Sequence, residues 1–137
     1  MADDRLIAAL DVPTWEDAEC LVKQLGDSVS YYKVGMELFY ALGGDIVTWL
    51  KEQEKKVFLD LKLHDIPNTV GNGLCSLLRL RPDILNVHTA GGLRMMKAAR
   101  EALHAAADRE GVLCPKLIGV TVLTSMDAED WAGLGHT

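Results

Sequence analysis

The sequence predicts an α/β fold built around a parallel sheet, and three observations support this prediction. Short apolar runs alternate with helical patterns along the whole chain. The apolar runs are nearly continuous, as in strands covered on both faces, and the segments between them are too long for β-hairpins. No low-complexity linker interrupts the alternation, so the 137 residues are predicted to form one domain.

Five apolar runs are predicted to be strands, because each is rich in aliphatic or aromatic residues and is followed by turn residues. The first leads into Asp11-Val12-Pro13, and the second ends at Gly35. In chain order, the predicted strands span residues 6–10, 31–34, 56–61, 84–88 and 116–122.

Helical periodicity fills each gap between these strands. Thr14-Trp15-Glu16-Asp17 has the form of a capping box, and Gly26 is placed to end the helix that follows. Further helical patterns cover about 37–53 with a break at Gly43-Gly44, about 69–80, a segment from Gly91-Gly92 to about 108, and a start at Asp127. Each complete helix joins two successive strands, which predicts right-handed crossovers.

Two folds fit this alternation, a doubly wound sheet and a (β/α)8 barrel. Every predicted strand delivers polar or small residues at its carboxyl end: Asp11, Lys33, Asp60 with Lys62, His88, and Thr121 to Thr124. In a barrel such ends converge on one pocket. The first strand also lacks the Gly-rich turn of a dinucleotide site. Both folds stay open at this point, but these observations favour a (β/α)8 TIM barrel fold, represented by about strands one to five with their helices.

Composition argues against several classes of function. A formal net charge of −6 and a pI near 5.1 are unsuited to binding nucleic acid or anionic lipid. Cys20, Cys75 and Cys114 are odd in number and widely spaced, which predicts no disulfide framework and no zinc site, and indicates a reducing, cytoplasmic compartment. The acidic start has no apolar signal core, and no apolar run approaches the roughly 20 residues that cross a bilayer. We expect neither export nor membrane insertion.

The most informative segment directly follows the third apolar run and contains Asp60, Lys62 and Asp65. Side chains alternate along a strand, so Asp60 and Lys62 point the same way. A turn at Leu63-His64 would return Asp65 toward them and place an ammonium between two carboxylates. A solvated turn with an incidental ion pair is the simpler interpretation, but the rigid Ile66-Pro67 and the preceding strand favour a functional site.

Other candidate residues have structural explanations of equal or greater weight. His88 at a strand end could act as an acid or base, but a hydrogen-bonded structural histidine is favoured. His64 is expected to be a loop residue. Gly91-Gly92 before a helix could cradle a phosphate group, although a tight turn explains both glycines equally well.

A family resemblance rests on several motifs in a fixed order. The strongest runs from Asp60 to Thr69 and reads Asp-Leu-Lys-Leu-His-Asp-Ile-Pro-Asn-Thr. The others are Leu10-Asp11-Val12, Lys33-Val-Gly-Met-Glu-Leu-Phe39, Asn86-Val-His-Thr-Ala-Gly-Gly92 and Val120-Thr-Val-Leu-Thr-Ser125. Together they resemble the orotidine 5'-phosphate decarboxylase family over essentially the whole chain. The resemblance implies decarboxylation of orotidine 5'-monophosphate to uridine 5'-monophosphate in pyrimidine biosynthesis.

The same resemblance implies roles for residues at matching positions. Lys62 would donate a proton to C6 of the pyrimidine, and Asp60 would lie beside the departing carboxylate. Lys33 would hold the charge network together and contact the ribose side, while Asp11 would bind a ribose hydroxyl. Because the family forms homodimers with shared active sites, the resemblance also assigns contacts with the neighbouring subunit's site to Asp65, Ile66 and Thr69. Thr124 would contact the ligand near the fifth strand.

The residue chemistry is consistent with that reaction. Loss of carbon dioxide from an sp2 carbon leaves a localised carbanion, which a fixed cation stabilises. Two carboxylates beside Lys62 would favour its charged form, so it should act as a cationic acid and not as a Schiff-base nucleophile. Lys62 would also compete with a metal for the oxygens of Asp60 and Asp65, so we predict no metal and no cofactor.

Length is the main departure from the family. A complete barrel has eight strands and typically about 250 residues, whereas five strands are predicted here. We therefore expect residues 1–137 to form a partial barrel domain, truncated after strand five, without the family's phosphate-binding elements. Remote phosphate contacts supply binding energy in the transition state, so activity of the chain alone is expected to be low.

Two alternatives stay open. One is a magnesium-dependent sugar-phosphate decarboxylase or aldolase of the same suprafamily, which shares the Asp-x-Lys-x-x-Asp pattern. Lys33 disfavours it, because those relatives tend to carry a carboxylate at that strand end. The other is an inactive fragment that needs another chain to complete the barrel.

Overall fold

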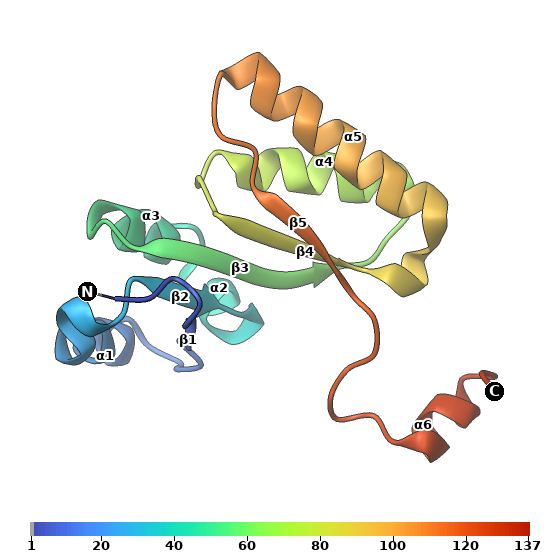
Figure 1. Cartoon of the computed structure of the whole chain (residues 1–137), viewed down its shortest axis with the longest axis horizontal. Coiled ribbons are helices and arrows are strands. Elements are labelled where there is room, and N and C mark those ends of the chain that lie inside the picture. Colours follow the sequence, from blue (N-terminus) through green and yellow to red (C-terminus); the bar gives the residue numbers. More distant parts are fainter. Residues whose placement is uncertain (1) are drawn as a thin grey trace.

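The computed structural model describes residues 2–137 and contains one parallel sheet with the strand order β1-β2-β3-β4-β5 (Figure 1). The strands are β1 (Ala8–Ala9), β2 (Tyr31–Val34), β3 (Lys56–Leu63), β4 (Ile84–His88) and β5 (Lys116–Val120). A doubly wound sheet reverses its strand order, whereas a barrel wall keeps the order of the sequence. The observed order is that of a barrel wall.

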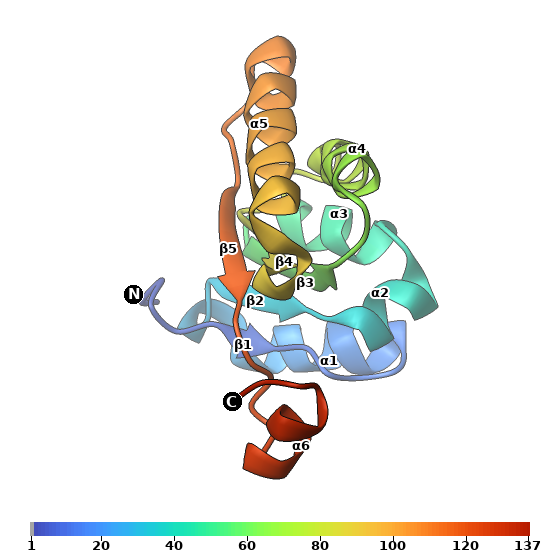
Figure 2. The same ribbon diagram turned by 90° about the vertical axis from the view of Figure 1, so that its right-hand side faces the viewer.

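The first five α-helices cover one face of this sheet, as Figure 2 shows. The α-helices are α1 (Trp15–Leu25), α2 (Met36–Leu42), α3 (Asp45–Glu52), α4 (Pro67–Leu78), α5 (Gly92–Glu110) and α6 (Ala128–Gly133), with 3-10 turns at η1 (Gly26–Ser28) and η2 (Thr89–Gly91). The short α6 lies away from the sheet, at the end of an extended segment (Figures 1 and 2). No helix within residues 2–137 is both long and apolar enough to span a membrane.

The hydrophobic core lies between the sheet and these helices. Strand residues that point toward the helices, such as Tyr32, Leu59 and Leu85, are fully buried. Because side chains alternate along a strand, the residues between them point to the opposite, concave face. This alternation places the polar groups of successive strands on one surface.

Local sequence signals set several helix ends. Thr14 Oγ1 accepts a hydrogen bond from the backbone N–H of Asp17, and Gly26 ends α1 with a φ of 49°. The other half of the predicted capping box differs, because the Asp17 carboxylate accepts from the Thr14 hydroxyl instead of the backbone. At the other end of the chain, Asp127 and Asp130 form a complete capping box for α6.

The predicted elements are present, with shifted ends in several cases. β1 is limited to two residues, and β5 ends at Val120. α4 starts at Pro67, because proline is pre-organised for the first helical position. The important difference is β3, which continues through Leu63, two residues beyond its predicted end and into the first residue of the predicted turn.

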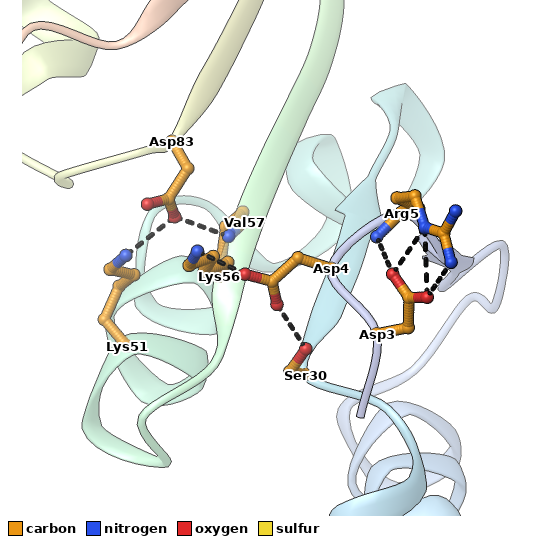
Figure 3. Close-up of polar contacts among 8 residues, drawn as sticks. All are labelled: Asp3, Asp4, Arg5, Ser30, Lys51, Lys56, Val57 and Asp83. Atoms are coloured by element: carbon orange, nitrogen blue, oxygen red, sulfur yellow. Dashed lines mark hydrogen bonds and ion pairs between the residues drawn. The ribbon is translucent and has the colours of Figure 1, made fainter. Parts of the chain in front are cut away.

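A polar cluster ties the amino ends of the strands together (Figure 3). Asp83 lies just before β4, and its Oδ2 accepts hydrogen bonds from Lys51 Nζ of α3 and from the backbone N–H of Val57, each at 2.7 Å. Two exposed ion pairs lie nearby: Lys56 with Asp4, and Arg5 with Asp3. This cluster is at the end of the sheet opposite the predicted site.

Candidate active site

An irregularity in β3 brings Asp60 and Lys62 together. Leu59 pairs with Leu85 and Leu63 pairs with Val87, so β3 advances four residues where β4 advances two. Lys62 has a φ of 51°, a left-handed conformation that non-glycine residues rarely adopt. Lys62 Nζ lies 2.7 Å from Asp60 Oδ1. The predicted contact between these two side chains is therefore present, on a bulged strand.

Lys33 extends this ion pair to the ends of β1 and β2. Its Nζ lies 3.5 Å from Asp60 Oδ2 and 3.2 Å from Asp11 Oδ1. Gly35 lies beside this contact, and a Cβ there would be in ordinary van der Waals contact with Lys33 Nζ, at 3.4 Å. Four charged groups, from the ends of three neighbouring strands, thus form one continuous network.

Asn86 on β4 completes the network, and the sequence analysis assigned it no role. Its Nδ2 donates to Asp60 Oδ1 at 2.7 Å, and its Oδ1 accepts from the backbone N–H of Lys62 at 2.8 Å. Its side chain is buried, and the residue is only 2% exposed. A polar residue in the middle of the apolar run 84–88 was the signal that could have identified it.

Asp60 is the most enclosed charge of the site, at 7% exposure. Burial alone would raise the pKa of Asp60, but hydrogen bonds from Lys62 and Asn86, with the positive charges of Lys62 and Lys33, lower it below the usual range. Asp60 is therefore an ionised carboxylate, shared between two ammonium groups.

Asp65 does not join this network, so the predicted triplet is wrong as a set of contacts within the chain. Asp65 is exposed, its Oδ1 accepts from the backbone N–H of Ile66 at 2.6 Å, and no ion pair found within residues 2–137 includes it. The reason is the length of β3: the strand continues through Leu63, so the chain does not turn back where the prediction required. Asp11 supplies the second carboxylate instead, through Lys33.

The remaining predicted ligand contacts are also separate from the network. Ile66 precedes α4 and is 66% exposed, and Thr69 is exposed in the first turn of that helix. Thr124 is exposed in the turn after β5. None of the side-chain hydrogen bonds found within residues 2–137 joins these three residues to Asp60 or Lys62.

His64 and His88 have no ion pair or side-chain hydrogen bond with the charge network in the part of the chain that the structure describes. The rings of His64 and His88 have centroids 5.6 Å apart, and both residues line a hollow beside α2 and α4 together with Met36 and Tyr40. Within residues 2–137 no group of three or more His, Cys, Asp or Glu residues is arranged to hold a metal ion.

Packing explains Gly91 and backbone conformation explains Gly92. A Cβ on Gly91 would lie 2.1 Å from Met95 Sδ, and Gly92 has a φ of 90°. The positive φ of Gly92 thus agrees with the predicted tight turn into α5, whereas Gly91 is explained by its contact with the Met95 side chain.

With this geometry described, comparison with known proteins gives a consistent result. Residues 4–135 match the model of the "Orotidine 5'-phosphate decarboxylase / HUMPS family". The chain belongs to this family. The match confirms the resemblance that the sequence motifs indicated.

Two similar relatives are orotidine 5'-phosphate decarboxylases from Carboxydothermus hydrogenoformans and Enterococcus faecalis. The first is 49% identical over 132 residues, which are 96% of this chain and 55% of the relative. The second is 51% identical over 128 residues, which are 93% of this chain and 54% of the relative. The chain therefore spans about half the length of the curated relatives it matches.

Solved structures give the same fold. The orotidine 5'-phosphate decarboxylase of Lactobacillus acidophilus superimposes with a TM-score of 0.86 at 42% identity, covering 96% of this chain and 59% of that one. The enzyme of Pyrococcus horikoshii gives 0.68 at 30% identity, covering 87% and 50%. The predicted (β/α)8 TIM barrel fold is confirmed, with five of its strands present here.

Proposed function

We propose that the protein decarboxylates orotidine 5'-monophosphate to uridine 5'-monophosphate in de novo pyrimidine biosynthesis. The single observation that carries this proposal is the network of Lys33, Asp60 and Lys62 on the concave face of a chain from this family. In this network the ammonium groups of Lys33 and Lys62 surround the buried Asp60 carboxylate. The network lies at the carboxyl ends of the strands, where barrels of this kind bind their substrates.

In the proposed mechanism, Lys62 acts on the carbon that loses its carboxylate. The bond between C6 and the carboxylate carbon breaks, carbon dioxide leaves, and the electron pair stays on C6. The Lys62 ammonium stabilises this negative charge and then donates a proton to C6. Asp60 beside the substrate carboxylate repels it before the reaction, and that repulsion ends when neutral carbon dioxide forms.

Lys33 and Asp11 serve the ribose side in this proposal. Lys33 contacts both carboxylates and keeps Asp60 in place, and its side chain is 24% exposed. The Asp11 side chain is 64% exposed, which leaves it free to bind a ribose hydroxyl.

We also propose a homodimer in which Asp65, Ile66 and Thr69 enter the neighbouring subunit's site. The support is exposure, since all three are accessible and none is used by the network of their own chain. Met36 and Tyr40, at 44% and 70% exposure, add apolar surface on α2. Thr124 is proposed to contact the ligand from the turn after β5.

We propose that residues 1–137 form a partial barrel domain, which supplies the first part of an eight-stranded barrel. Apolar residues on β5 and just after it are exposed, with Ile118 and Val122 each at 43%. Further strands and helices of the barrel would cover them. We also propose a cytoplasmic location, because the three cysteines are odd in number and widely spaced.

Decarboxylation of orotidine 5'-monophosphate, followed by its ultraviolet absorbance change, tests the proposal. The assay uses the purified chain and a chimera that joins it to the second half of the Carboxydothermus hydrogenoformans relative. Lys62→Ala is the matched variant, and we expect it to abolish turnover while uridine 5'-monophosphate still binds.

Retained turnover in Lys62→Ala would contradict the role of Lys62. A folded chimera that binds the nucleotide but never turns it over would contradict the proposed reaction. Turnover of a sugar phosphate that stops when EDTA removes magnesium would instead support the magnesium-dependent alternative. Activity only in the chimera would support the need for the second half of the barrel.

A further inference from the structure

The bulge in β3 creates a hydrogen-bonding problem at the site. Between the pairs Leu59–Leu85 and Leu63–Val87, β3 has residues 60–62 where β4 has only Asn86. A regular ladder cannot pair the backbone of these extra residues. The N–H of Lys62 lies in this mismatch at a partly buried position, where an N–H without an acceptor costs free energy.

Asn86 solves this problem with its side chain. Its carbonyl oxygen accepts from the Lys62 N–H at 2.8 Å, and its amide nitrogen donates to Asp60 Oδ1 at 2.7 Å. The Lys62 N–H requires an acceptor, and the Asp60 carboxylate requires a donor. A primary amide has both groups in one plane. An aspartate at this position would offer only acceptors, and a leucine would offer neither.

The same two contacts act on the two groups of the proposed reaction. Lys62 Nζ and Asn86 Nδ2 both bond to Asp60 Oδ1, each at 2.7 Å, which leaves Oδ2 to Lys33. Asn86 thus links both the Asp60 carboxylate and the Lys62 backbone to β4, with Lys62 at its left-handed φ.

We propose that Asn86 is a positioning residue, whose amide clamps the Asp60 carboxylate and the Lys62 backbone. The clamp keeps the Lys62 ammonium in contact with the Asp60 carboxylate. Its connection to turnover rests on the proposed function, whereas the clamp itself does not. Asn86 acts through Asp60 and Lys62, and no contact with substrate is assigned to it.

Two substitutions of similar size separate the two halves of the clamp. Asn86→Leu removes both hydrogen bonds. Asn86→Asp keeps the acceptor for Lys62 N–H but replaces the donor to Asp60 with a second carboxylate. The controls are Asn72→Leu and Asn72→Asp, because Asn72 is exposed on α4.

Hydrogen exchange and carboxyl titration, both followed by NMR on the chain itself, test the clamp. In Asn86→Leu the Lys62 amide should exchange at least about tenfold faster, because its acceptor is gone. In Asn86→Asp that amide should stay protected, but Asp60 should titrate about one pH unit higher or more, because two carboxylates then share one site. The other charges facing Asp60 are Lys62 on β3 and Lys33 on β2, with Asp11 behind Lys33.

Unchanged Lys62 exchange in a folded Asn86→Leu chain would overturn the proposal. If Asn86→Leu does not fold, the titration of Asp60 in Asn86→Asp decides, and an unchanged midpoint overturns it. The Asn72 variants should leave both signals as they are in the unsubstituted chain.

Turnover of the chimera separates positioning from a merely structural role. Both Asn86 variants should lower kcat by at least about tenfold while affinity for uridine 5'-monophosphate changes by less than about twofold, because Asn86 acts on the reacting groups only. An equal loss of kcat and affinity would overturn the positioning role. If the unsubstituted chimera folds and binds the nucleotide but has no turnover, the proposed function fails, while exchange and titration still decide whether Asn86 is a clamp.

Discussion

At the amino end of the sheet Asp4 and Asp3 each pair with one cation on the surface, whereas at the carboxyl end Asp60 is shared by two lysines and an asparagine. The Asp4–Lys56 side chains are about half exposed, at 52% and 49%. The Asp60 side chain is 9% exposed. The same residue types thus occupy very different environments at the two ends.

The difference shows what each cluster can contribute. Exposed pairs are screened by water and salt, and most contribute little to stability. A buried carboxylate costs free energy to desolvate, and its partners must offset that cost. Side chains held at such a cost are common at functional sites, and they are pre-organised for charge that develops during a reaction.

Asp83 is an intermediate case, because it lies at the amino end but binds the backbone. Its carboxylate accepts from Val57 N–H and from Lys51, its own N–H donates to Val57, and its carbonyl accepts from Lys116 N–H. It therefore connects α3, β3 and β5, mainly through contacts with backbone groups.

The largest expected effect comes from Asp60→Asn in the chimera. Removing this charge should lower turnover by about 10³-fold or more, because the Lys62 ammonium loses its partner 2.7 Å away. Steady-state assays measure it. Asp83→Asn makes the same chemical change at the amino end of the sheet and should leave turnover unchanged. Equal losses of turnover in both variants would contradict the functional difference between the two ends of the sheet.

Asp83→Ala should show the reverse behaviour, with a loss of stability and no loss of turnover. The Val57 N–H and the Lys51 ammonium lose their shared acceptor, which should lower the free energy of unfolding by about 2 kcal/mol. Urea denaturation followed by circular dichroism measures this. Asp27→Ala, at an exposed carboxylate, is the control, and an equal change there would contradict the role of Asp83.

Alkaline unfolding tests Tyr31, at the amino end of β2. Burial, with the negative charges of Asp83 and Asp4, raises the pKa of Tyr31 to about 12. The folded state then binds more protons than the unfolded state between pH 10 and 12, so stability falls as pH rises through that window, by up to about 2 kcal/mol. Tyr31→Phe should show a smaller loss over the same window in urea denaturation; the same loss in both chains would contradict this assignment.

The smallest effect is expected for Lys56→Gln. Its partner Asp4 is on the surface, so the pair should contribute nothing measurable to stability. The midpoint of urea denaturation should not move, at low or at high salt. A clear, salt-dependent decrease would show that the amino-end pairs contribute more than their exposure indicates.

Much of the fold could be predicted because its signals are local. The Thr14 cap, the Gly26 stop and the strand 84–88 were all correctly placed, because each depends on neighbours in the chain. The contact between Asp60 and Lys62 was also predicted, but from regular alternation along a strand, whereas in the structure it lies on the bulged part of β3. Asp65 was misplaced, because the prediction ended β3 too early.

The sequence by itself determined the order of strands and helices, the charges available at each strand end, and the family. These follow from short-range preferences and from residue types, which need no partner strand. The tertiary structure decided the bulge in β3, the left-handed Lys62 and the clamp by Asn86. Register and buried hydrogen bonds depend on which strand lies alongside, and only the packed sheet brings Asn86 to Asp60, 26 residues earlier in the chain.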